Sequence, residues 1–194
     1  MGLRILARHA HSTLNLEHRV NGDPLVTVPL TDEGREEARR LGEQLAHVQL
    51  DLVLHTRFGR TRETAEVALG SRSIQMEVEP MLDDIDVGEL EGSPVEEYRA
   101  WKREHRRGDV FPGGESLDDA ARRYAEAFRR LAARPERRIV VICHEIPVRY
   151  ALNAAGGSGD LDRPAHDIPN ATPYFFDPPV LAVAALRIAA LAPA

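Results

Sequence analysis

The sequence contains one cysteine, Cys143, among 194 residues, so no disulfide can form within the chain. Without disulfides the fold must be stabilised by a hydrophobic core, and this length suffices for one domain with such a core. Sparse cysteine also suits a reducing compartment, and we therefore expect a cytoplasmic protein. We interpret Cys143 as a small core residue and not as a reactive thiol.

The sequence also lacks an excess of positive charge and a long apolar run. Its formal net charge is −6 at pH 7, so no overall basic field attracts nucleic acid or an anionic membrane surface. The apolar tail over residues 180–194 contains Arg187 and falls short of the ~20 residues that a membrane-spanning helix needs. We expect neither nucleic acid nor a membrane as a partner. An anionic ligand would have to be attracted by a local cluster of cations.

Short apolar runs alternate with amphipathic segments along the chain. Residues 139–143 are continuously apolar and β-branched, which is typical of a central strand. Further strands are expected at 5–7, 52–54 and 74–78, with a last pair near 174–176 and 184–188. Helices are expected from Asp32, over 59–69, from 94 to about 107, over 117–133 and over 147–155, with 12–29 irregular. This order predicts a three-layer α/β/α sandwich with a mainly parallel sheet, in a single domain spanning residues 1–194.

Polar side chains follow three of the predicted strands at the point where each strand ends. The first strand is followed by Arg8 and His9, the second by Arg60 within a helical turn, and the strand at 139–143 by His144. Ligands of open α/β sheets bind at the carboxyl ends of the strands. Two guanidinium groups and two imidazoles suit a tetrahedral dianion such as a phosphate ester. Arg57 lies in the same region, and we interpret it as a solvated residue.

Seven motifs carry a resemblance to a known family. They are Arg8-His9-Ala10-His11-Ser12 with Asn15, residues 29–34, Arg60 with residues 63–65, residues 82–92, residues 111–116, residues 141–144 and residues 169–172. In this order they resemble the motifs of the histidine phosphatase superfamily, whose members share the phosphoglycerate mutase-like fold. The matches are colinear and span nearly the whole chain, so the sequence is identified as a member of that superfamily.

The resemblance implies phosphoryl transfer through a phosphohistidine, without a metal or another cofactor. His9 would attack phosphorus, and Asp84 would protonate the leaving oxygen and then deprotonate the attacking water. The phosphoryl oxygens would be held by Arg8, Asn15, Arg60 and His144. His9 must be neutral to attack, and nearby arginines lower the pKa of an imidazole.

The chain departs from the pattern of the family at four positions. Ala10 stands where the family has Gly, so the backbone there must accept a Cβ. His11 replaces a usual Glu or Gln at the mouth of the pocket, where we expect it to contact substrate; the alternative is an ordinary surface residue. Asp84 stands for a longer Glu, and the alternatives for its acid role are Asp83, Asp86 and Glu89. Glu145 follows the second histidine, where it would repel phosphate if it pointed inward.

These observations favour a phosphomonoesterase acting on a small phosphorylated metabolite. A phosphomutase using the same site is the first alternative, but the short segment 92–113 favours the phosphatase. A metal-dependent hydrolase could use His9 and His11 with the aspartates of the acidic loop, although the flanking arginines would repel a metal ion. A non-catalytic module that binds a phospho-ligand is a further alternative, prompted by the departures from the family.

Two further features are open on the sequence alone. The basic run at 101–107 is interpreted as a solvated helix face, and the alternative is a receptor for a second acidic group of the substrate. Edge strands near the carboxyl terminus could pair between subunits, so a homodimer is possible.

Overall fold

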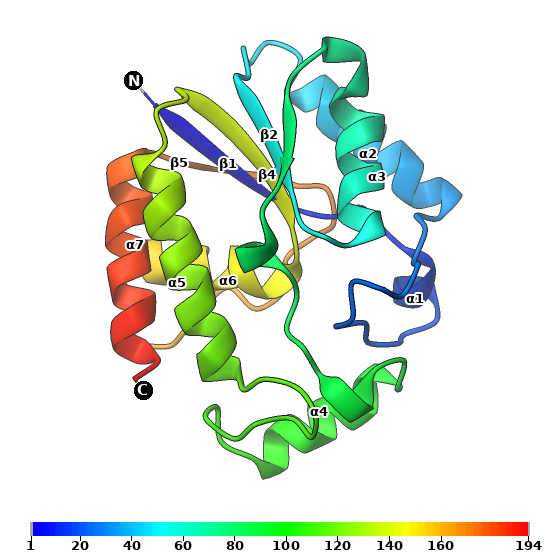
Figure 1. Ribbon diagram of the computed structural model, residues 1–194, viewed down its shortest axis with the longest axis vertical. Coiled ribbons are helices and arrows are strands. Elements are labelled where there is room, and N and C mark those ends of the chain that lie inside the picture. Colours follow the sequence, from blue (N-terminus) through cyan, green and yellow to red (C-terminus); the bar gives the residue numbers. More distant parts are fainter. Residues whose placement is uncertain (1, 194) are drawn as a thin grey trace.

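The centre of the molecule is a five-stranded sheet with the strand order β3-β2-β4-β1-β5 (Figure 1). The computed structural model describes residues 2–193. The strands are β1 (Leu3–Arg8), β2 (Leu52–His55), β3 (Met76–Val78), β4 (Arg138–Cys143) and β5 (Pro173–Phe176). The first four run parallel to one another, and β5 pairs antiparallel with β1. The prediction of a mainly parallel sheet is therefore confirmed.

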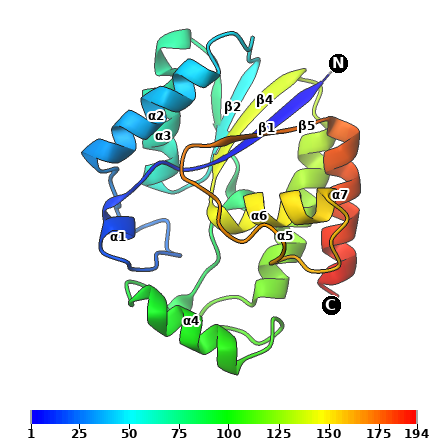
Figure 2. The ribbon, with the colours of Figure 1, turned by 180° about the vertical axis from the view of Figure 1, so that it is seen from behind.

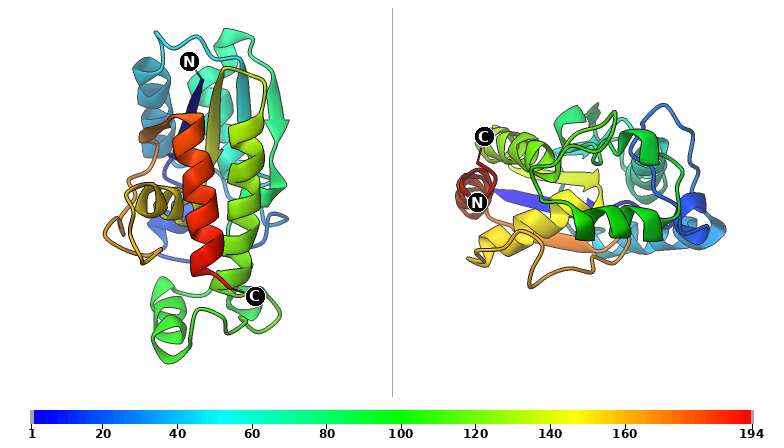
Figure 3. Two further views of the ribbon diagram at one scale, coloured as in Figure 1. Left: turned by 90° about the vertical axis from the view of Figure 1, so that its left-hand side faces the viewer. Right: turned by 90° about the horizontal axis from the view of Figure 1, so that it is seen from below.

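Helices cover both faces of this sheet and complete the expected three-layer sandwich (Figures 2 and 3). They are α1 (Thr13–Leu16), α2 (Asp32–Gln44), α3 (Gly59–Leu69), α4 (Val95–Glu104), α5 (Leu117–Ala133), α6 (Glu145–Ala155) and α7 (Pro178–Leu191). Helices α2 and α3 pack on one face, while α5, α6 and α7 pack on the other. No helix among the described residues is long and apolar enough to cross a bilayer.

The central strand β4 is apolar on both sides because each side faces a separate layer of helices. Val140 and Ile142 join the core beneath α2 and α3, whereas Ile139, Val141 and Cys143 join the core beneath α5 and α7. All five side chains are fully buried. Burial raises the pKa of the Cys143 thiol to about 12, which agrees with its interpretation as a core residue.

The expected helix starts appear with their side-chain caps. The Thr31 hydroxyl accepts a hydrogen bond from the backbone N–H of Gly34 at 3.0 Å, at the start of α2. At the start of α5, the Ser116 hydroxyl accepts from the backbone N–H of Asp119 at 3.0 Å, and the Asp119 carboxylate accepts in return from the backbone N–H of Ser116 at 3.1 Å. Each cap satisfies backbone donors that the first helical turn leaves free.

The prediction of a strand at 184–188 is wrong, because these residues lie within α7. Two prolines occupy the first turn of that helix, where their missing N–H groups are not needed. The side chains that α7 buries are Leu181, Ala184, Ala185 and Ile188, which repeat at helical spacing. This leaves β5 as the only strand in the carboxyl-terminal part of the described chain. Within the segment expected to be irregular, residues 13–16 form the short helix α1.

Candidate active site

Strand register brings the polar strand ends together at one edge of the sheet. Arg8 pairs with Cys143, and His55 pairs with Ile142, so β1, β4 and β2 end side by side. The chain leaves β1 toward α2 on one face and leaves β4 toward α6 on the other. A crevice forms between strands where successive helices diverge in this way.

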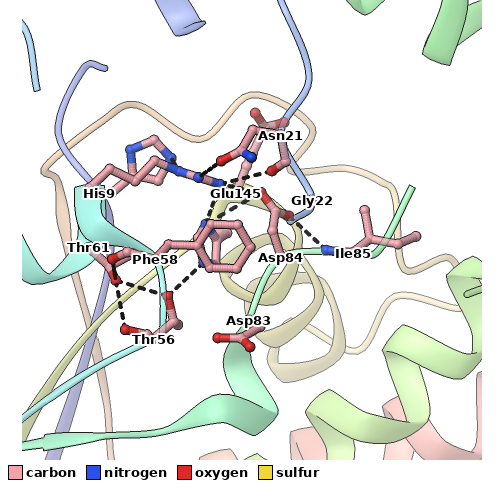
Figure 4. Close-up of polar contacts among 12 residues, drawn as sticks. His9, Asn21, Gly22, Thr56, Phe58, Thr61, Asp83, Asp84, Ile85 and Glu145 are labelled. Carbon is pink, nitrogen blue, oxygen red and sulfur yellow. Dashed lines mark hydrogen bonds and ion pairs between the residues drawn. The ribbon is translucent and has the colours of Figure 1, made fainter. Parts of the chain in front are cut away.

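One buried guanidinium, that of Arg60, connects the groups at this edge. Its Nε donates to His9 Nε2 at 3.0 Å, and its Nη2 donates to His144 Nδ1 and to Asp84 Oδ2, both at 3.1 Å. Its Nη1 donates to Asn21 Oδ1. Figure 4 shows His9, Asn21 and Asp84 converging on this centre. The Arg60 side chain is only 4% exposed, so these contacts act with little screening by water.

The bond to Arg60 also determines the proton position on His9. A guanidinium has only donors, so His9 Nε2 must accept with its lone pair. The proton then lies on Nδ1, which donates to the carbonyl oxygen of Ala10 at 2.8 Å. Burial lowers the pKa of His9 well below its ordinary range, and the charges of Arg60 and Arg8 act in the same direction. His9 is therefore a neutral imidazole whose Nε2 lone pair faces Arg60.

His144 is fixed by a second chain of hydrogen bonds that sequence reasoning did not find. Its Nδ1 accepts from Arg60, so its Nε2 carries the proton and donates to Thr56 Oγ1 at 2.9 Å. The Thr56 hydroxyl lies 2.9 Å from Thr61 Oγ1, which donates to the carbonyl oxygen of Phe58 at 2.8 Å (Figure 4). Burial lowers the pKa of His144, as does the charge of Arg60. The one available sequence signal was a polar residue, Thr56, directly after β2.

Asp84 is the acidic-loop carboxylate that reaches this centre. Its Oδ2 lies 3.1 Å from Arg60 Nη2 and 3.4 Å from His144 Nδ1. Burial raises the pKa of Asp84, although the Arg60 charge opposes that shift. A carboxyl group in this setting can hold a proton at a higher pH than an exposed aspartate.

The three alternative acids of the loop lie elsewhere. The Asp83 carboxylate accepts from the backbone N–H of Arg57 at 2.9 Å and from its Nε at 2.5 Å, so both of its oxygens are bound to Arg57. Asp86 and Glu89 are exposed, and neither lines the cavity at the strand ends. The structure therefore brings Asp84 to the site and leaves Asp83, Asp86 and Glu89 outside it.

A cavity of about 550 Å³ lies over these groups. The predicted residues that line it are Arg8, His9, Asn15, Arg60 and Asp84. His144 is fully buried and lies behind Arg60. Asn15 accepts from the backbone N–H and the hydroxyl of Ser12 through Oδ1, at 3.1 and 3.0 Å. Its amide nitrogen is therefore the group that can donate to a ligand.

The expected position of His11 at the mouth of the pocket is not what the structure shows. His11 Nδ1 lies 3.1 Å from Thr31 Oγ1, and its backbone N–H donates to the Glu37 carboxylate at 2.8 Å. His11 does not line the cavity. Side-chain direction after a strand end depends on the following turn, and here the chain turns toward the start of α2.

Two other departures from the family pattern have structural answers. The Cβ of Ala10 is buried in the core beneath α2 and α3, so the backbone accepts it without loss of space in the cavity. The Glu145 carboxylate does point into the cavity, but two arginines neutralise it. Arg8 Nη1 lies 3.0 Å from Glu145 Oε2, and Arg149 Nη2 contacts Glu145 Oε1.

A further site residue, Asn21, was interpreted from the sequence only as part of a turn. Its Oδ1 accepts from Arg60, while its Nδ2 donates to the Glu91 carboxylate at 2.7 Å. That carboxylate also accepts from the backbone N–H of Gly22 at 2.6 Å. Glu91 thus fixes the turn that carries Asn21 to the cavity.

The site does not resemble a metal centre. Within residues 2–193, no three or more side chains of His, Cys, Asp or Glu are arranged to hold a metal ion. The histidines and aspartates that suggested a metal site in the sequence do not come together in the fold, since His11 lies outside the cavity and Asp83 binds Arg57.

The chain is similar to known proteins in both sequence and fold. The family model of the histidine phosphatase superfamily (branch 1) matches residues 4–177. A probable phosphoglycerate mutase, GpmB, of Salmonella choleraesuis is 28% identical over 149 residues, which cover 73% of this chain and 68% of that protein. The structure of YhfR of Bacillus stearothermophilus superposes with a TM-score of 0.77 at 27% identity, over 89% of each chain. TTHB049 of Thermus thermophilus has a TM-score of 0.68 at 30% identity, over 90% of this chain and 93% of that one.

Proposed function

This chain belongs to the histidine phosphatase superfamily, and we propose that it is a phosphomonoesterase that needs no metal. It would hydrolyse a small phosphorylated metabolite through a phosphohistidine on His9. The observation that carries the proposal is the contact of one guanidinium with three groups. Arg60 reaches His9 Nε2 at 3.0 Å, and both Asp84 and His144 at 3.1 Å. A nucleophile, an acid and a phosphate-binding cation thus share one centre.

The reaction has two displacements at phosphorus. In the first, the His9 Nε2 lone pair forms the N–P bond, the P–O ester bond breaks, and Asp84 gives its proton to the departing oxygen. In the second, Asp84 takes a proton from water as the water oxygen bonds to phosphorus and the N–P bond breaks. Free phosphate then leaves and His9 is neutral again. Positioning and charge stabilisation supply most of the catalysis in such transfers.

The cations Arg8 and Arg60 would stabilise the phosphoryl oxygens as charge develops on them. Arg60 is already held at the centre by four side chains, and its Nε would release the His9 Nε2 lone pair when that atom attacks phosphorus. Arg8 donates to the Ile168 carbonyl oxygen at 2.8 Å and pairs with Glu145 at 3.0 Å. Phosphate would compete with Glu145 for Arg8. Asn15 would supply an amide donor at the edge of the same site, while Asn21 would orient Arg60 through its Oδ1.

A phosphomutase is the main alternative, and one relative carries the name of a probable phosphoglycerate mutase. A mutase must keep water away from the phosphohistidine until a second hydroxyl arrives. The segment that could cover the site is short here, because between residues 92 and 113 it contains only the helix α4. This feature favours transfer to water.

The direct test is release of inorganic phosphate from an aryl phosphate and from a panel of phosphorylated metabolites, with and without a chelator. Because fixed arginines supply the positive charge, we expect the chelator to change the rate by less than ~2-fold. Loss of activity on chelation, with recovery on adding a divalent metal, would contradict the proposal. Transfer of the phosphoryl group to an added alcohol in preference to water would instead identify a mutase.

The pH dependence of the rate provides a second test, because the proposal predicts the direction in which the rate changes. The neutral form of His9 is the nucleophile, and its pKa is lowered by burial and by Arg60. The loss of activity that comes from protonation of His9 should therefore occur only as pH falls through that lowered value, below the ordinary pKa of about 6.5. The rate of phosphohistidine formation at saturating substrate, measured by rapid quench from pH 7.5 to 6, should not decrease. A decrease with its midpoint at or above pH 6.5 would show that His9 is not held neutral.

A further inference from the structure

The Glu145 carboxylate lies in the cavity over His9 and Arg60, and the proposed mechanism gives it no part. Glu145 is the first residue of α6, which begins directly after His144 at the end of β4 (Figure 1). It lines the cavity together with Arg8, and its side chain is 31% exposed. A carboxylate beside a site for a phosphate dianion weakens binding of that dianion by charge repulsion. The contacts of Glu145 show how the site accommodates this charge.

The stability of α6 explains only one of the two ion pairs that Glu145 makes. Arg149 Nη2 contacts Glu145 Oε1 one helical turn away, which is the usual pairing of opposite charges four residues apart. The second carboxylate oxygen, Oε2, lies 3.0 Å from Nη1 of Arg8, at the end of β1. This second pair joins two separate elements, and its cation is one that would hold the phosphoryl group. Glu145 thus occupies Arg8 from inside the cavity.

Arg149 gives Glu145 a counter-ion that does not depend on Arg8. The Arg149 side chain is only 12% exposed, and its Nη1 lies 3.4 Å from Asp162 Oδ1. Asp162 in turn contacts Arg107, which lies in the connection between α4 and α5. Because Arg149 is held from this second side, the Glu145 carboxylate stays paired when Arg8 turns to another anion. The exchange therefore avoids the cost of a half-buried carboxylate without a partner.

Arg8 also keeps a contact when Glu145 leaves it. Its Nη1 donates to the carbonyl oxygen of Ile168 at 2.8 Å, so the guanidinium remains oriented toward the cavity. The Arg8 side chain is 16% exposed, so water replaces a lost anionic partner only in part. An anion on Arg8 is thus favourable both with and without a ligand. In the free site Glu145 is that anion, and in the occupied site the phosphoryl group takes its place.

We infer that Glu145 is an internal competitor of phosphate for Arg8, and that it lowers the affinity of the site for the phosphate product. This rests on the proposed function for the position of the phosphoryl group, beside His9. Glu145 acts through Arg8 and touches no reacting atom, so it is a positioning residue. Fixed, poorly hydrated arginines would otherwise retain orthophosphate. Because affinity differences at one site are expressed mainly in the rate of dissociation, the competing carboxylate speeds release of orthophosphate after the second displacement.

The test measures binding of orthophosphate by calorimetry, which needs no turnover. Glu145→Gln keeps the shape of the side chain and removes its charge, while Glu145→Ala removes the whole carboxylate. We expect both variants to bind orthophosphate about 10-fold more tightly than the wild type, because the repulsion removed outweighs the one contact that Arg8 loses. The constant for inhibition of aryl phosphate hydrolysis by orthophosphate should fall by the same factor. A merely structural role predicts the opposite, since a loosened site binds phosphate more weakly.

Asp167→Asn is the matched control for a general effect of charge. Asp167 is an exposed carboxylate that lines the same cavity, and in the described part of the chain Arg8 is paired with Glu145 and not with Asp167. Because water and salt screen an exposed charge, its removal should change the affinity for orthophosphate by less than ~2-fold.

Two results overturn the inference. One is an affinity for orthophosphate that is unchanged, reduced or undetectable in both Glu145 variants. The other is a gain in Asp167→Asn as large as the gain in the Glu145 variants, which would show a general effect of charge and no competition for Arg8. Tighter binding in both Glu145 variants, with no phosphate release by the wild type from any substrate, would contradict the proposed function alone.

Discussion

Replacing His9 with alanine is expected to lower the rate of phosphate release by at least ~10⁴-fold, because neither His144 nor Cys143, which lie at the neighbouring strand end, can take its place as nucleophile. His144 is fully buried, its Nε2 donates to Thr56, and its Nδ1 accepts from Arg60. The thiol of Cys143 is also buried, and its raised pKa keeps it protonated. The remaining activity should be near that of the uncatalysed reaction in the same buffer.

The measurement is phosphate release from an aryl phosphate, together with rapid-quench trapping of an acid-labile phosphoprotein from labelled substrate. The wild type should form the labelled species and His9→Ala should not. His47→Ala is the matched control, because His47 is exposed and lies outside the cavity, and it should leave both readouts unchanged. A His9→Ala protein that still forms the acid-labile label would place the nucleophile elsewhere.

Replacing Asp84 with asparagine is expected to have an effect that depends on the leaving group. An alkyl oxygen leaves poorly unless it is protonated, so the rate with an alkyl phosphate should fall by about 10³-fold. A p-nitrophenolate ion leaves without a proton, so the first step with that substrate should lose about 10-fold or less. Burial raises the pKa of Asp84, which favours the protonated form that carries this proton.

The comparison uses single-turnover rates with both substrates, because the second step also needs Asp84 as a base. Asp86→Asn is the control, since that exposed carboxylate lies outside the main cavity and only caps the backbone N–H of Gly88. The melting temperature of Asp84→Asn, compared with that of the wild type, checks that the protein still folds when Arg60 has lost its carboxylate partner. An equal loss with both leaving groups would assign Asp84 to positioning of Arg60 and not to proton transfer.

The helices and strands were largely predictable, because their signals are local. Thr31 and Ser116 occupy cap positions whose bonds form within three residues, and β4 is apolar because both of its faces are covered. The wrong prediction of a strand at 184–188 also came from relying on a local signal. Within 184–188 a strand and a helix are hard to distinguish, whereas the longer stripe from Leu181 to Ile188 has helical period.

What the sequence by itself determined is the set of groups at the strand ends: Arg8, His9, Arg60 and His144. It could do so because parallel strands end at a common edge, whatever their separation along the chain. The tertiary structure alone decided which of the loop residues join them. It directs Asp84 to Arg60 and Asp83 to Arg57, turns His11 toward Thr31, and brings Asn21 and Thr56 to the site. A side chain's direction in a loop depends on contacts with residues far away in the sequence, and no local pattern encodes those contacts.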